Sequence, residues 1–177
     1  MLLPLDNMQT RLFTPKRHWY VAYTLPRSEV KARDEILSMG IEAYVPLRKT
    51  IKKWSDRKKM VEEPLMRSYV FVYGTEKERV KAIEARHAVR YICFGGKPAN
   101  VRDQDIQFLK RLLLEEAEFD VETQHIPKGT EVEVIAGAFI GHRGELDEYL
   151  NRSRVVIRFV QAGFNIATKI PVNQVRP

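Results

Sequence analysis

Apolar and polar positions along the first two thirds of the chain predict a mixture of strands and helices. Short runs of aromatic and β-branched residues are typical of buried strands, and four of them occur before residue 100: 19–24, 41–45, 68–73 and 89–94. Between and after them, apolar residues recur at helical spacing following Ser28, following a capping box at 75–78, and over 106–113. This order predicts an α+β sandwich in which helices pack on a mostly antiparallel sheet.

The last third of the chain has the pattern of an all-β domain. Apolar and polar residues alternate over 131–134, 155–160 and 164–170, and glycines stand between these segments. Several short strands of this kind predict a small closed barrel. The preceding segment is acidic and shows no period. We therefore expect four parts: a tail over 1–17, an α/β domain over 18–116, a linker over 117–127 and a barrel domain over 128–177.

The sequence gives no sign of export or of a membrane. The first residues lack both a basic flank and a small-residue cleavage site, and no run approaches the roughly 18 apolar residues that cross a bilayer. Cys93 is the single cysteine, so an intramolecular disulfide is impossible. We expect a cytoplasmic protein that does not contact a membrane.

Positive charge is concentrated in one short stretch. The chain carries 30 Lys and Arg against 23 Asp and Glu, a net charge of +7. Residues 1–120 account for +6 of this excess, and residues 48–59 alone hold seven basic residues against Asp56. A run of this density is either a solvated loop or a contact surface for a polyanion. Because Ser55 and Asp56 are turn formers, we expect a loop or hairpin here.

No arrangement typical of a catalytic or metal site occurs in the sequence. The chain has four histidines: His18, His87, His125 and His142. None of them lies at ligand spacing from another or from Cys93, and the motifs of serine hydrolases, P-loop nucleotidases and zinc proteases are absent. Adjacent carboxylates such as Glu62 and Glu63 generally point apart on a strand or helix. We expect a protein that is not an enzyme and holds neither metal nor cofactor.

Two parts of the chain resemble the domains of a known family. The run KGTEVEV at 128–134, with the glycines that follow it, resembles a KOW motif, the turn-rich start of a five-stranded barrel. The run WYV at 19–21 and the run EPLMRSYVFV at 63–72 resemble the two best signatures of the N-terminal domain of NusG transcription factors, and 89–98 continues the likeness. Together these segments resemble the NusG family over residues 18–177.

Some details resemble specialised members of this family, RfaH and the UpxY-type regulators of capsule polysaccharide operons. These details are the run EPL at 63–65 and the basic segment around 54–59. The resemblance implies an elongation and antitermination factor whose N-terminal domain binds the polymerase clamp through an apolar hollow, touches the opposite gate loop and bridges the DNA cleft. Such a factor suppresses pausing and termination because it binds one conformation of the polymerase better than another.

Matched positions imply two sets of polymerase contacts. The clamp contact falls on five residues: Tyr23, Leu65, Met66, Tyr69 and Phe71. Phe71 is more simply interpreted as a core residue, whereas contact and core packing both stay open for the other four. The gate-loop contact falls on Arg79 and Lys81, although the segment lacks the hydroxyl-rich character of the RfaH motif.

Contacts with nucleic acid are expected from two further sets. The resemblance to RfaH implies that Arg27, Lys31 and Arg86 lie beside the exposed non-template strand, and a solvated helix face is the alternative. The density of charge in the basic stretch predicts contacts with DNA or nascent RNA, in which an aromatic residue near the tip stacks on an unpaired base. The residues concerned are Lys52, Lys53, Trp54, Arg57, Lys58 and Lys59.

The expected partners are RNA polymerase, the non-template strand or nascent RNA of the elongation complex, and a ribosomal protein or termination factor that the KOW domain recruits. The alternative is a ribosome-associated RNA-binding protein, which would also carry a KOW barrel and a basic surface. Such a protein is expected to carry its basic excess on the barrel. Residues 121–177 have a net charge of only +1, which favours the transcription factor.

Overall fold

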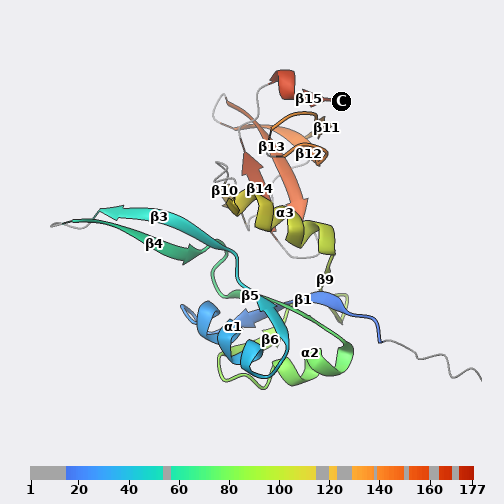
Figure 1. The fold of residues 1–177 in the computed structure, drawn as a ribbon. Helices are drawn as coiled ribbons and strands as arrows, with labels where there is room; N and C mark the ends of the chain where they lie inside the picture. Colours follow the sequence, from blue (N-terminus) through green and yellow to red (C-terminus); the bar gives the residue numbers. More distant parts are fainter. Residues whose placement is uncertain are drawn as a thin grey trace, which may run out of the picture.

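An antiparallel sheet organises the N-terminal part of the molecule (Figure 1). The computed structural model describes residues 15–53, 57–114, 120–122, 129–137, 139–149, 152–159, 164–168 and 172–177. The central strand β1 (His18–Thr24) pairs along one edge with β5 (Tyr69–Gly74), and along the other with β6 (Ala88–Tyr91) and β9 (Asn100–Val101). Strand β2 (Glu42–Tyr44) completes the sheet by pairing with β5.

Alternation of side chains in β1 and β5 gives this sheet two apolar faces. On one face, Ala22 and Val72 belong to a buried cluster with residues of α1 (Glu29–Ser38) and α2 (Glu76–Ala82). On the opposite face, Val21 and Phe71 belong to a second cluster with α3 (Asp103–Leu114). The predicted sandwich of helices on an antiparallel sheet is therefore confirmed for the N-terminal domain.

The two shorter helices begin where the sequence predicts, but only one start uses the expected hydrogen bonds. At α2 the Glu78 amide donates to Thr75 Oγ1 at 3.3 Å, and the Thr75 amide donates to Glu78 Oε2 at 2.7 Å, which confirms the capping box. At α1, Ser28 occupies the N-cap position without a side-chain cap, because its hydroxyl donates to the Pro26 carbonyl instead.

The basic stretch forms a two-stranded hairpin, as expected. Strands β3 (Leu47–Lys53) and β4 (Lys58–Pro64) pair in register along their whole length. Figure 1 shows the hairpin projecting away from the sheet. A second and much shorter hairpin, β7 (Cys93–Phe94) and β8 (Lys97–Pro98), turns through two glycines with positive φ.

The described C-terminal residues form a six-stranded antiparallel sheet in the order β10-β14-β13-β12-β11-β15. The expected all-β character of this part is confirmed for the described residues, whereas closure into a barrel stays a prediction. The elements are β10 (Asp120–Glu122), β11 (Thr130–Val134), β12 (Arg143–Tyr149), β13 (Arg152–Phe159), β14 (Phe164–Thr168), the 3-10 helix η2 (Val172–Gln174) and β15 (Val175–Arg176).

Part of the expected linker is a strand, which the sequence did not predict. Residues 120–122 form β10, which pairs with β14 from Asp120↔Ala167 to Glu122↔Asn165. This pairing uses backbone groups along the edge of β14, so an acidic segment without alternation can still form it. The rest of 117–127 lies outside the described residues, as do residues 1–14 of the predicted tail.

Candidate functional site

The face of the N-terminal sheet that carries α3 is rich in aromatic side chains. Tyr23 and Tyr69 are register partners on adjacent strands, and their rings meet edge to face with centroids 6.2 Å apart. Both side chains are partly exposed. Burial raises the pKa of Tyr69, and the neighbouring Tyr23 adds to this shift, so the phenol stays neutral and can donate a hydrogen bond. Paired tyrosines that combine an apolar ring with a polar tip are typical of protein interfaces.

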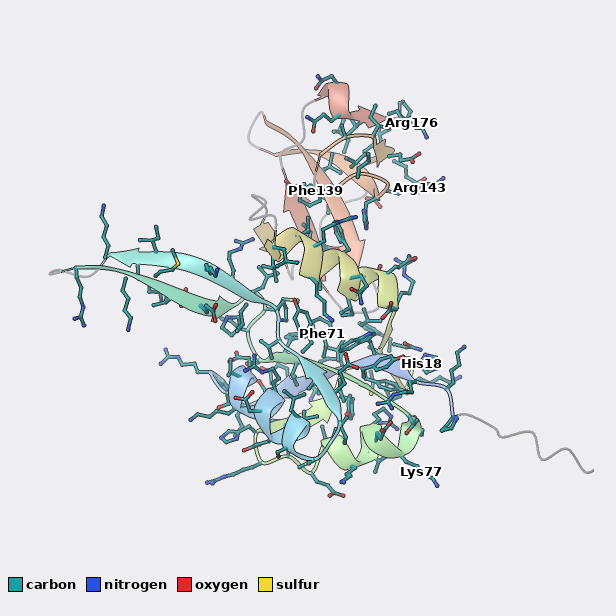
Figure 2. All side chains as sticks on the ribbon, in the orientation of Figure 1. His18, Phe71, Lys77, Phe139, Arg143 and Arg176 are labelled. Atoms are coloured by element: carbon teal, nitrogen blue, oxygen red, sulfur yellow. The ribbon has the colours of Figure 1, made fainter. Side chains whose placement is uncertain are left out.

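The predicted clamp residues lie close to this pair, but they differ in exposure. Leu65 and Met66 lead into β5 and pack against the same apolar cluster. Leu65 is partly exposed, whereas Met66 is 4% exposed and Phe71 is fully buried, between the sheet and α3 (Figure 2). A side chain without exposed surface offers no atom to a partner in this conformation. Tyr23, Leu65 and Tyr69 are thus the accessible part of the predicted contact.

Cationic side chains lie over the aromatic rings of this face. The guanidinium carbon of Arg90 is 5.7 Å from the centroid of Tyr23, and Lys110 Nζ on α3 is 5.5 Å from that of Trp19 and 5.1 Å from that of Tyr44. Burial raises the pKa of Tyr44 to about 12. Sequence reasoning missed both cations, because only strand register and helix packing bring them to their rings. They add positive charge beside the tyrosine pair.

The two residues predicted to touch the gate loop have different surroundings. The Arg79 guanidinium forms an ion pair with Glu76 and lies 5.6 Å from the ring of Tyr20 and 5.2 Å from that of Tyr91. The Tyr91 hydroxyl donates to the Arg79 carbonyl at 2.8 Å. Arg79 is therefore held by contacts within its own domain, whereas Lys81 is exposed on α2.

The three basic residues expected beside the non-template strand are all exposed. Arg27 precedes α1 and Lys31 lies in its first turns. The third, Arg86, follows α2, and its neighbour His87 binds Glu35 of α1 through its amide at 3.1 Å and its Nδ1 at 2.7 Å. This contact holds the loop of Arg86 against the helix that carries Lys31.

Opposite charges neutralise the base of the β3–β4 hairpin, but its outer half is strongly basic. At the base, Arg48 and Lys49 are register partners of Glu63 and Glu62. Further out, lysines stand opposite lysines in two successive pairs, Lys52↔Lys59 and Lys53↔Lys58. Like charges directly opposite each other destabilise a strand pair. Lys52 Nζ donates a hydrogen bond to Glu63 Oε1 at 2.5 Å.

Accessibility makes the outer half of the hairpin suitable for a large anionic partner. The side chains of Lys52, Arg57, Lys58 and Lys59 are exposed, and Figure 2 shows long side chains reaching outward from both strands. The predicted contacts of Trp54 and of the Lys53 side chain lie outside the described residues.

Helix α3 also contacts the C-terminal part of the chain, at the segment between β11 and β12. The Phe108 ring meets that of Phe139 edge to face at 5.8 Å and stacks on the His142 imidazole at 3.6 Å between centroids. Burial lowers the pKa of His142; nearby Arg111 lowers it further, while hydrogen bonds with the carbonyls of Ile140 and Phe139 and the charge of Asp105 oppose the shift. The stacked imidazole is therefore neutral near pH 7.

We expect this contact to weaken as the pH falls below about 6.5, the ordinary pKa of histidine. When the contact is open, His142 takes up a proton below this pH, whereas the stacked imidazole resists protonation because its pKa is lowered. The stabilisation that the stacked contact provides is therefore present above this pH and is lost on acidification. The measurement is the NMR shift of the Phe108 ring from about pH 8 to 5. The variant His142→Phe keeps a ring against Phe108 and should remove most of the dependence; an unchanged titration would contradict the assignment.

Two negative results concern the described part of the chain. No group of three or more His, Cys, Asp or Glu side chains there could hold a metal ion. None of the helices described is long and apolar enough to cross a membrane.

One solved structure with a similar backbone supports the fold. The structure of Thermotoga maritima NusG aligns with a TM-score of 0.54 at 20% identity, over 91% of this chain and 97% of that one. The MjSpt4:Spt5 complex aligns over 89% of this chain and 96% of that chain at 17% identity. Its TM-score of 0.31 is too low to indicate a shared overall fold. No curated protein matches the sequence.

The family itself is shown by the sequence. The profile of the NusG family, described as transcription termination factor nusG, matches residues 17–110. This range contains the whole sheet with its aromatic face, the β3–β4 hairpin and most of α3. Because the match covers more than half of the chain, the protein belongs to the NusG family.

Proposed function

We propose that this protein is a transcription elongation and antitermination factor that binds RNA polymerase through the aromatic face of its N-terminal sheet. The observation that carries the proposal is the family match over residues 17–110, which contain the partly exposed Tyr23–Tyr69 pair. Aromatic side chains of this kind dominate the energetics of protein interfaces. Bound across the polymerase cleft, the factor favours the closed clamp over the open, paused state, without a chemical step.

The surroundings of the tyrosine pair favour a partner that is apolar at its centre and acidic at its edge. Tyr23, Tyr69 and Leu65 supply apolar contact area, and Arg90 stands beside them. A carboxylate on the partner could pair with this arginine when the rings are covered. Such complementary charges increase the rate and specificity of association more than the affinity.

The β3–β4 hairpin is proposed as a second contact, with the DNA or RNA of the elongation complex. Its outer lysines repel one another across the strands, and phosphates bound between them would remove this repulsion. Contacts of this kind depend on charge and read little sequence. Among the other predicted contacts, Arg27, Lys31 and Arg86 are proposed to lie beside the non-template strand, and Lys81 beside the gate loop.

Changing Lys52, Lys58 and Lys59 together to alanine is expected to weaken binding to a complete elongation complex and to make it less dependent on salt. The slope of log K against log salt should fall by about 0.9 for each phosphate that the variant no longer binds. Binding to polymerase without nucleic acid should stay nearly unchanged, since the aromatic face is intact. Titrations at several salt concentrations measure both effects.

A matched control removes three exposed lysines that lie outside the hairpin: Lys16, Lys77 and Lys97. This control lowers the net charge equally, so it should leave the salt slope close to that of the parent. Equal salt slopes for the hairpin variant, the control and the parent would show that the hairpin is solvated and does not bind nucleic acid.

For the C-terminal sheet we propose a KOW barrel that recruits a ribosomal protein or a termination factor. The support is the KOW-like run at 128–134, of which residues 130–134 form β11 and begin a set of antiparallel strands. The basic hairpin and the EPL run at its base favour a specialised paralog of the UpxY type over a general NusG factor.

Co-purification tests the proposed function as a whole. Affinity capture of the tagged protein from its own cells should enrich the polymerase subunits, and transcripts should lengthen when the protein is present. Capture of ribosomes without polymerase would instead favour the ribosome-associated alternative.

A further inference from the structure

A buried carboxylate joins the start of α1 to the turn between β4 and β5. Glu29, the first residue of α1, is only 5% exposed, and its Oε1 accepts a hydrogen bond from the Ser68 amide at 2.6 Å. The two residues are 39 positions apart in the sequence. A carboxylate removed from water needs such partners, and the positive end of a helix also favours its charge. Neither the family match nor the predicted contacts assign a role to Glu29.

The residue that Glu29 holds has an unusual backbone. Ser68 has a φ of 61°, in the left-handed region that residues other than glycine rarely adopt. Its carbonyl accepts from the buried Thr24 amide at 2.9 Å, so both of its backbone groups are fixed by partners on other elements. Backbone strain of this kind persists only where the surrounding structure enforces it, and it is frequent at functional sites.

The position of Ser68 explains what this conformation does. Leu65 and Met66 precede it, Tyr69 follows it, and all three pack against the cluster that underlies the aromatic face. The left-handed residue turns the chain between them. If Ser68 moved to an extended conformation, the direction of Leu65 and Met66 relative to Tyr69 would change.

We propose that Glu29 is a positioning residue of the polymerase-binding face: by holding Ser68 in the left-handed conformation, it fixes Leu65 and Met66 relative to the Tyr23–Tyr69 pair. This inference rests on the proposed function. Because Glu29 also begins the helix that carries Lys31, and follows the exposed Arg27, it joins the proposed polymerase contact to the residues proposed beside the non-template strand. A partner that moves the start of α1 therefore also moves the turn at Ser68.

The first arm of the test measures the geometry and does not need polymerase. In the full-length protein, Glu29→Ala should shift the Ser68 amide proton upfield, because the acceptor of its hydrogen bond is gone. The same change should weaken the nuclear Overhauser contacts between Leu65 and the Tyr69 ring. Glu29→Gln retains an acceptor oxygen and should preserve both signals. An unchanged Ser68 amide in Glu29→Ala would overturn the proposal.

The second arm measures binding to polymerase that lacks nucleic acid. Glu29→Ala should lose at least about tenfold in affinity, and Glu29→Gln less than about threefold, because interface contacts depend on a preorganised surface. Adding Ser68→Gly to Glu29→Ala should recover part of the loss, since glycine adopts positive φ readily. General destabilisation would not give this rescue.

The matched control is Glu35→Ala, which removes a carboxylate of the same helix that holds the loop of His87 instead. It should lower the stability of the domain while leaving the affinity for polymerase without nucleic acid within about twofold of the parent, because the Glu35–His87 contact takes no part in the aromatic face. Equal losses of polymerase affinity for Glu29→Ala and Glu35→Ala would show that Glu29 contributes only to the stability of the domain. If the parent protein does not bind polymerase, the proposed function fails, and the first arm alone decides whether Glu29 positions the turn.

Discussion

Replacing Tyr69 or Leu65 with glutamate is expected to abolish polymerase binding while leaving a folded protein. Each change places a charge in the apolar part of the proposed contact, where it must lose its water without gaining a partner. Tyr69→Glu also removes the edge-to-face contact with Tyr23. Because hot-spot residues contribute about 2 kcal/mol or more, the dissociation constant should rise by at least roughly 30-fold. Pull-down and titration with purified polymerase measure the loss.

The same chemical change at Leu37 is the control. Leu37 lies on α1 with 45% of its surface exposed and takes no part in the aromatic face. Leu37→Glu should bind polymerase like the parent, and circular dichroism should show all three variants folded. Parent-like binding by both Tyr69→Glu and Leu65→Glu would exclude this face as the polymerase contact.

Replacing Phe71 with alanine is expected to destabilise the N-terminal domain by about 3–5 kcal/mol. Phe71 is fully buried between the sheet and α3 and contacts the Tyr44 ring at 6.3 Å between centroids, so its removal leaves a cavity that the rigid sheet closes only in part. Urea unfolding of the parent and the variant gives the difference in free energy.

The exposed Phe94 of β7 provides the comparison. Half of its surface is open to solvent, so Phe94→Ala should change stability by no more than about 0.5 kcal/mol. A loss below about 1 kcal/mol for Phe71→Ala would mean that the site relaxes around the missing ring. Such a result would contradict the assignment of Phe71 to the tightly packed core.

Local patterns were sufficient to predict most of the N-terminal domain. The aromatic and β-branched runs became β1 and β5, the capping box at Thr75 began α2, and the dense charge after Arg48 became an exposed hairpin. In each case the deciding interaction lies between residues near one another in the sequence, or is the burial of one regular stripe of side chains.

The features that the sequence did not reveal depend on contacts between distant segments. In the sequence, Glu29 is an ordinary glutamate of a first helical turn, and its hydrogen bond with Ser68 forms only in the folded chain. Arg90 is a polar position of a short strand, and it reaches the Tyr23 ring only because β6 pairs with β1. Strand β10 was missed for the same reason, because its pairing with β14 leaves no alternation in its own residues. A glutamate in the first turn of a helix is a weak signal for such a contact, since solvent-exposed glutamates are common there.

The pairing of β1 also has a consequence for the protein during its synthesis. This apolar strand is synthesised before the strands that pair with it. The backbone partners of Trp19 are complete only after Tyr73 and then Val101 have been added. An unpaired apolar strand in a nascent chain tends to aggregate, and charged residues beside such strands oppose this. Arg17 precedes β1 directly and Arg27 follows it within three residues. We expect these two positive charges to oppose aggregation of the growing chain until the partner strands have paired with β1.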